Sequence, residues 1–168
     1  MPYELKRPAC AGPCGGHEYG DVSIKKEAFY EGAALQLLVR ANAVTEFRYE
    51  APFYIVDGGM LLYLKYSTKG RSPWPFTFAP DEQALLRDRA AASPLAIGLV
   101  CGSDGVVALS YQAFAGVATP RGSAVRISCY RQRGEHYELN GPDGTSIRKI
   151  APSSWLRILE RRGEDETS

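Results

Sequence analysis

Two charged residues stand where the sequence pattern expects apolar side chains, and they are the first candidates for chemistry. Lys65 follows Met-Leu-Leu-Tyr-Leu in a strand-like run, so bulky apolar neighbours flank its stem. Glu31 falls within the apolar stripe of a helical segment, where a carboxylate is costly unless it is paired, hydrogen-bonded or bound to a metal. Two interpretations are open. Either the two side chains meet as an ion pair or a site, or Lys65 extends along the sheet and keeps its ammonium group in water.

The run that contains Lys65 is the second half of a predicted hairpin. Residues 53–56 and 60–66 are apolar and are joined by Asp-Gly-Gly at 57–59, a sequence that favours the positive φ angles of tight turns. Side chains alternate along a strand, so Tyr63 and Lys65 share one face. The hairpin therefore places Lys65 near a strand end, just before a basic loop.

Periodicity predicts the other elements. A first helix is expected from about 24 to 41, with Glu31 in a stripe that includes Ile24 and Leu38. A second helix begins at Pro80 with acidic residues in its first turn and ends near Ala92. Further strands are predicted at 45–50, 95–101, 106–111, 124–130, 137–139 and 146–150, and a short helix is predicted around 154–159.

The loop after the Lys65 strand carries Lys69, Arg71 and Trp74. Lys65, Lys69 and Arg71 could contact phosphates, and the Trp74 indole could stack on a base, which would make this loop a nucleic-acid-binding element. The alternative is that Trp74 and Phe76 enter the core while Lys69 and Arg71 stay solvated on the surface.

Residues 1–20 are rich in glycine, proline and charge and are expected to form an irregular N-terminal arm. Cys10, Cys14 and His17 lie within it at a spacing that could supply three zinc ligands. A tetrahedral zinc site usually takes four ligands, and no fourth is close by in the sequence, so a flexible or sheet-covering arm is favoured over a metal site.

Length and charge describe a single domain. A chain of 168 residues buries roughly two-thirds of its unfolded surface, and 20 basic residues nearly cancel 19 acidic ones. Any site for a polyanion must therefore be a local patch. The sequence shows no membrane span and no signal peptide, which predicts a cytoplasmic protein with reduced thiols. Cys101 and Cys129 are expected to pack as small apolar side chains, and residues 161–168 to form a charged tail.

Together with Glu31 and Lys65, the order helix, three strands, helix, strand resembles the PD-(D/E)xK (restriction-endonuclease-like) phosphodiesterase superfamily over about residues 22–101. The resemblance implies an α/β fold with a mixed central sheet and an αβββαβ core at 21–101. A β-rich extension of the same domain then occupies 102–160. It also implies that Glu31 and Lys65 form the catalytic pair and that a divalent metal, Mg²⁺ or Mn²⁺, activates the attacking water.

The resemblance is incomplete at the remaining motif positions. The acid expected two residues before the lysine is replaced by Tyr63, and the expected Pro-Asp falls on Pro-Phe at 52–53. Asp57 is the carboxylate that could serve as a displaced metal ligand beside Glu31, although aspartate before two glycines is typical of a turn. The resemblance therefore implies a nuclease-like domain that has lost catalysis and binds nucleic acid or a protein partner, with no cofactor.

Two alternatives stay open. One is an active Mg-dependent nuclease with a rearranged site of Glu31, Asp57 and Lys65. The other is a structural or regulatory interaction subunit. The stretch at 65–78 also resembles a segment of a bacterial protein family that shares the later turn at 99–105, and that family has no assigned function.

Overall fold

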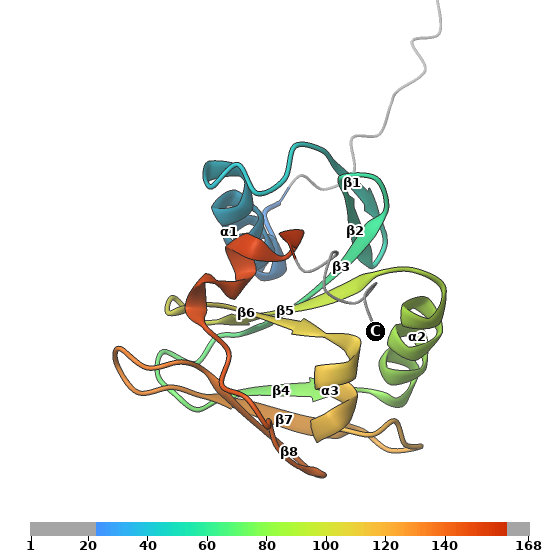
Figure 1. The fold of residues 1–168 in the computed structure, drawn as a ribbon, viewed down its shortest axis with the longest axis vertical. Helices are drawn as coiled ribbons and strands as arrows, with labels where there is room; N and C mark the ends of the chain where they lie inside the picture. The colour runs from blue at the N-terminus through green and yellow to red at the C-terminus, as the bar shows by residue number, and fades with distance from the viewer. Residues whose placement is uncertain (1–22, 161–168) are drawn as a thin grey trace, which may run out of the picture.

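The computed structural model describes residues 23–160, which hold nine strands and four helices (Figure 1). The predicted N-terminal arm with its three metal-ligand candidates lies outside the described residues, as does the predicted tail. In chain order the elements are α1 (Lys26–Arg40), β1 (Phe47–Glu50), β2 (Phe53–Val56), β3 (Met60–Ser67), β4 (Trp74–Phe78), α2 (Pro80–Ala92), β5 (Leu95–Cys101), β6 (Gly105–Ser110), α3 (Tyr111–Val117), β7 (Val125–Tyr130), β8 (Glu138–Gly141), β9 (Gly144–Thr145) and the 3-10 helix η1 (Pro152–Arg157).

The strands form two sheets, so the predicted mixed α/β fold is confirmed. The first is a five-stranded sheet with the order β1-β2-β3-β5-β6, in which β3 and β5 run parallel and the other neighbours antiparallel. The second is a four-stranded antiparallel sheet with the order β4-β7-β8-β9. The predicted β2–β3 hairpin is present, and all three residues of its turn have positive φ.

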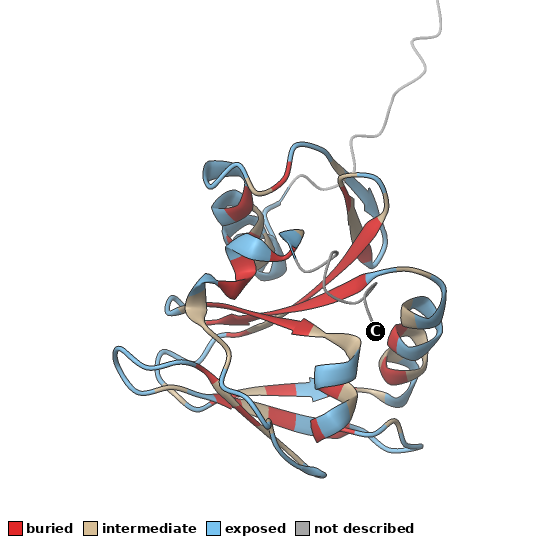
Figure 2. Ribbon diagram, viewed as in Figure 1, coloured by how far each residue is buried: buried red, intermediate tan, exposed pale blue. Residues whose placement is uncertain are grey.

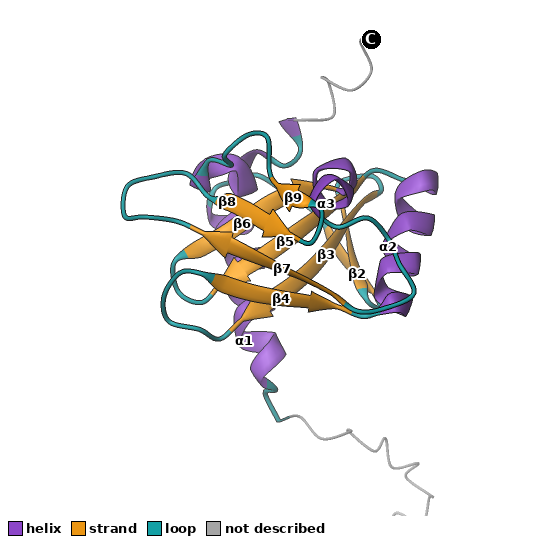
Figure 3. Cartoon of the chain, turned by 90° about the horizontal axis from the view of Figure 1, so that it is seen from below, coloured by secondary structure: helices purple, strands orange, loops and turns teal. Residues whose placement is uncertain are grey.

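The two sheets pack face to face, and helices cover the apolar surface that the sheets do not cover for each other (Figures 1 and 3). One apolar cluster fills the space between the sheets and takes in side chains of α2 and α3. A second cluster lies on the opposite face of the five-stranded sheet, beneath α1 and η1. Buried residues accordingly concentrate on the strands that both clusters touch (Figure 2).

Strand β5 is the centre of this arrangement, and all seven of its residues are buried. A strand that is covered on both faces reads as a continuous apolar run. A Cβ atom added at Gly98 would lie 2.6 Å from Cδ2 of Leu64 and 2.9 Å from Cζ3 of Trp155, so the glycine makes room for the indole. The Trp155 Nε1–H group donates to the carbonyl of Ala34 at 2.9 Å and fixes η1 to α1.

Residues on both sides of position 101 contribute to the two sheets. Strand β6 belongs to the five-stranded sheet beside β5, and β4 from the first half pairs with β7 from the second. The region after residue 101 also contains α3 and η1. Residues 102–160 therefore complete both apolar clusters.

Two local predictions need correction. The apolar stripe of α1 is shorter than expected, because Ile24 and Ala28 are exposed while Ala34 and Leu38 are buried. The segment at 74–78, read as the end of a loop, forms the edge strand β4, which tolerates Pro75 because an edge strand has backbone N–H groups outside the ladder. Among the described residues, no helix is long and apolar enough to cross a membrane.

Candidate functional site

Lys65 lies on the face of β3 that turns toward α2, and its partner is Glu82 in the first turn of that helix. The ammonium group forms an ion pair with Glu82 Oε1, and the Tyr63 hydroxyl donates to the same oxygen at 2.5 Å. The Lys65 Nζ atom lies 4.7 Å from the centroid of the Phe78 ring. The exposed fractions of the two charged side chains are 22% and 26%, so the pair is largely removed from water.

Three hydrogen-bond donors contact the Glu82 carboxylate, and together they lower its pKa. Burial alone would raise the pKa of Glu82, but hydrogen bonds from Lys65, from Tyr63 and from the Ala79 backbone N–H hold it below its ordinary value. The last of these bonds, at 2.8 Å, satisfies a free donor at the start of α2. The pKa of Tyr63 is raised by burial and by the Glu82 carboxylate, so the phenol stays a hydrogen-bond donor. The cluster therefore joins α2 to the sheet.

The expectation that Glu31 and Lys65 approach each other is wrong. Helix α1 packs on the other face of β3, where Tyr30 stacks on Tyr66 with ring centroids 4.8 Å apart. Glu31 accepts a hydrogen bond from the Tyr54 hydroxyl at 2.7 Å. Of the four causes that raise the pKa of Tyr63, the charge of Glu31 is the smallest. Alternation along β3 is the physical reason, because odd and even residues leave the strand on opposite faces.

Asp57 is a turn residue, as the simpler interpretation of the sequence held. Its carboxylate accepts hydrogen bonds from the Thr45 backbone N–H at 2.9 Å, from the Thr45 hydroxyl at 2.9 Å and from the Glu46 backbone N–H at 2.8 Å. Its φ of 35° is the left-handed conformation that aspartate tolerates. The structure thus does not bring Glu31, Asp57 and Lys65 together. Within residues 23–160, no group of three or more His, Cys, Asp or Glu side chains could hold a metal ion.

Trp74 is not available to a nucleic acid base. It is 3% exposed, its indole N–H donates to the Lys69 carbonyl at 2.9 Å, and its ring meets the edge of Tyr137 at 6.2 Å. Stacking on a base would require Trp74 to leave the core, so this expectation is also wrong. Lys69 and Arg71 are exposed, as both interpretations of the loop allowed.

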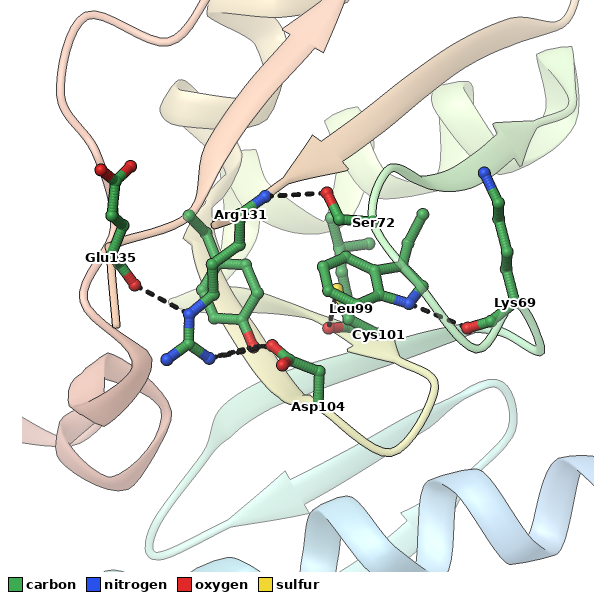
Figure 4. Close-up of polar contacts among 9 residues, drawn as sticks. Lys69, Ser72, Leu99, Cys101, Asp104, Arg131 and Glu135 are labelled. Carbon is green, nitrogen blue, oxygen red and sulfur yellow. Dashed lines mark hydrogen bonds and ion pairs between the residues drawn. The ribbon is translucent and has the colours of Figure 1, made fainter. Parts of the chain in front are cut away.

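The structure gathers further cations beside Lys69 and Arg71. The Arg131 backbone N–H donates to the Ser72 hydroxyl at 3.0 Å, which joins loop 68–73 to loop 131–136 (Figure 4). Segment 147–149 lies beside the second loop, because Tyr137 pairs with Ile150 and the Lys149 Nζ atom lies 3.4 Å from a Glu135 carboxylate oxygen. We call the cationic side chains of these segments the basic loop cluster: Lys69, Arg71, Arg131, Arg133, Arg148 and Lys149.

One of these cations serves as the scaffold of the cluster. The Arg131 guanidinium bonds to Asp104 Oδ2 at 2.9 Å and to the Glu135 carbonyl at 2.7 Å, and it lies 4.9 Å from the Tyr137 ring centroid (Figure 4). The Tyr137 hydroxyl donates to the same Asp104 oxygen at 2.5 Å. Burial and the Asp104 carboxylate raise the pKa of Tyr137, which keeps that donor in place.

Three other cations are free to meet a ligand. Arg71, Arg133 and Arg148 are exposed and form no hydrogen bond or ion pair with any described residue. Of these three, Arg71 is among the residues that the sequence indicates as a site, and Arg133 and Arg148 are not. The run Arg-Gln-Arg-Gly at 131–134 was a visible signal, but only the pairing of β4 with β7 shows that it lies beside Arg71.

Comparison with known proteins finds no match for this chain among protein-family models, curated proteins or solved structures. The resemblance to the PD-(D/E)xK superfamily therefore stays a prediction from the sequence.

Proposed function

We propose that this chain is a nuclease-like domain that binds the backbone of nucleic acid through the basic loop cluster and does not cut it. The observation that carries the proposal is the concentration of charge. The three segments 68–73, 131–136 and 147–149 and the turn 102–104 hold six lysines and arginines against two carboxylates. The whole chain has a net charge of only +1. Such a patch is the electrostatic footprint of a polyanion site.

The arrangement of the cations supports phosphate as the ligand. Arg71 and Arg133 are exposed on neighbouring loops, and a guanidinium can bind phosphate through two parallel hydrogen bonds. Arg131 and Tyr137 hold the loops that carry them, so little ordering remains to be done on binding. With Trp74 buried, the phosphate contacts of the cations dominate the cluster, which favours binding that is independent of sequence and strongly dependent on salt.

The order of the elements supports the nuclease-like part of the proposal. Helix α1, strands β1 to β3, helix α2 and strand β5 follow the expected αβββαβ order, with β4 inserted before α2. The loss of cutting is supported by the partner of Lys65. Glu82 neutralises the ammonium group and is itself occupied by Tyr63 and the start of α2, so neither side chain is poised over a metal.

The test is binding of fluorescein-labelled 20-nucleotide single- and double-stranded DNA and RNA, followed by anisotropy at several salt concentrations. Arg71→Glu/Arg133→Glu is expected to weaken binding at least tenfold and to lower the magnitude of the salt slope by about two. The control Arg48→Glu/Arg87→Glu changes the net charge equally at exposed arginines on β1 and α2. Equal losses in both variants would show that the cluster is not the site.

A cleavage assay with Mg²⁺ or Mn²⁺ tests the second half of the proposal. No cleavage is expected from the wild type. Cleavage that disappears in Lys65→Ala would mean that the domain is an active nuclease.

A protein partner is the second candidate, because an acidic segment would meet the same free arginines. An oligoglutamate peptide that competes with DNA at lower concentration than an unlabelled oligonucleotide would favour that candidate.

A further inference from the structure

A cleft lies between α3 and the segment 145–151, and its rim shares Arg148 and Lys149 with the basic loop cluster. Its volume is about 710 Å³, which is within the range of small-molecule sites. Helix α3 is held at its start by the Ser110 hydroxyl, which accepts from the Ala113 backbone N–H at 3.1 Å. The opposite wall is anchored by the Tyr137–Ile150 bridge. Both walls are therefore tied to the sheets, and the cleft is part of the fold.

The lining of the cleft combines an apolar interior with a cationic rim. Ala113, Ile147, Ile150 and Ala151 contribute accessible apolar surface, and the buried side chains of Val117 and Leu139 lie behind it. The rim carries Arg148 and Lys149 together with His136, and no aspartate or glutamate is among the described residues that line the cleft. A ligand that suits these walls has an apolar body and one negative charge.

Two details indicate that the cleft is open to such a ligand. Ile147 is 102% exposed at the rim, and an apolar side chain that nothing covers gains most from a partner. Gly116 lies on the cleft side of α3, and a Cβ atom added there would meet no atom within 4 Å. The space beside this glycine is therefore available to a ligand.

We propose that this cleft is a binding site for a small anionic amphiphile, with a medium-chain carboxylate such as dodecanoate as the type of ligand. The acyl chain lies on the apolar interior, and the carboxylate meets Arg148, which has no partner among the described residues. Lys149 contributes less because its ammonium group is already 3.4 Å from Glu135. A nucleic acid strand does not suit the interior, since its sugar-phosphate backbone would lie against apolar walls. The inference goes beyond the proposed function and does not depend on it.

The experiment measures displacement of 8-anilinonaphthalene-1-sulfonate, an anionic fluorescent probe, from the full chain at ligand concentrations below micelle formation. Dodecanoate is expected to displace the probe, and dodecyltrimethylammonium, with the opposite charge, is expected not to. Dodecanol is expected to compete at least tenfold more weakly than dodecanoate.

Matched variants locate the site. Gly116→Phe fills the cleft and is expected to weaken dodecanoate binding at least tenfold. Gly32→Phe makes the same change at a helical glycine on α1 that also has open space around it, and is expected to leave binding unchanged. Arg148→Gln, a surface change that does not depend on repacking, is expected to weaken dodecanoate about tenfold and to leave dodecanol unchanged.

Several results would overturn the inference. They are equal displacement by the cationic and anionic amphiphiles, retention of binding in Gly116→Phe, and equal losses of dodecanoate and dodecanol in Arg148→Gln. If the probe binds only after residues 161–168 are removed, the occupant of the cleft is this segment of the chain and not a small molecule. Arg71→Glu/Arg133→Glu is expected to keep dodecanoate binding whatever its effect on DNA, so the two proposals fail separately.

Discussion

The Lys65–Glu82 pair offers the sharpest test of how this fold is held together. Lys65→Met keeps the apolar stem over the Phe78 ring and removes the charge. Glu82→Gln also removes the charge and keeps one carbonyl oxygen, which can accept from either Tyr63 or the Ala79 N–H at the start of α2. Each single change leaves the other charged group without its partner in a largely buried position. The double variant removes both charges together, so it leaves no charged group without a partner.

The magnitude follows from burial. Fully exposed pairs contribute about 0.2–1 kcal/mol, and breaking a buried pair costs about 3–5 kcal/mol. With side chains that are 22% and 26% exposed, each single variant is expected to lose about 1–2 kcal/mol of the free energy of unfolding. The double variant is expected to lose about 1 kcal/mol less than the sum of the two.

Urea denaturation at pH 7 and 25 °C, followed by circular dichroism and tryptophan fluorescence, gives the four free energies of the cycle. A coupling free energy below about 0.3 kcal/mol would refute the reasoning, because the two side chains would then act independently.

The pH dependence of the same variants has a defined sign. The pKa of Glu82 is lowered in the folded protein, so its carboxylate contributes stability that is fully present above the unfolded value of about 4.5. That contribution is lost as the pH falls through the lower folded value. The stability difference between the wild type and Glu82→Gln is therefore expected to be constant from pH 7 to about 5.5 and to shrink below about 4.5. A difference that grows on acidification would contradict the assignment.

The remaining predictions concern close contacts and buried thiols. Gly141→Ala places a Cβ atom 2.1 Å from the Val117 carbonyl oxygen, so it is expected to cost about 3 kcal/mol or more in urea denaturation. Gly122→Ala, which meets no atom within 4 Å, is expected to stay within about 0.5 kcal/mol of the wild type. The pKa of the Cys101 thiol is raised by its hydrogen bond with Cys129 and by burial. Iodoacetamide at pH 8 is therefore expected to leave both thiols unlabelled in the native protein and to label both in urea, as peptide mass spectrometry would show.

The sequence predicts the elements whose signals are local. Helix α2 begins where the proline and the acidic first turn place it, and it ends near Ala92 as expected. The β2–β3 hairpin follows from the turn at 57–59, and β5 follows from a run of seven residues without a charge. In each case the local chemistry agrees with what the tertiary structure needs, so no long-range information is required.

What could not be predicted depends on which segments meet. The strands of both sheets have similar alternation, so nothing local assigns β4 and β7 to a second sheet. Glu82 has the appearance of an ordinary first-turn acid, and only the packing of α2 on the inner face of the five-stranded sheet makes it the partner of Lys65. Helix α3, in contrast, had a local signal, because Ser110 is a typical N-terminal capping residue. The strand predicted at 106–111 included Ser110, so this helix was not predicted.

The place of β4 in the chain has a consequence for how the molecule gains and loses its structure. This strand lies between β3 and α2, yet its ladder partner β7 begins almost fifty residues later. Neither the N-terminal half nor the C-terminal half of the chain therefore holds all the strands of either sheet, and loop closure over this distance must precede the pairing of β4 with β7. We therefore expect the two sheets to unfold together in one cooperative transition. A nascent chain that has reached only Cys101 carries unpaired edges on both β4 and β5, which are templates for association with other chains until the remainder emerges.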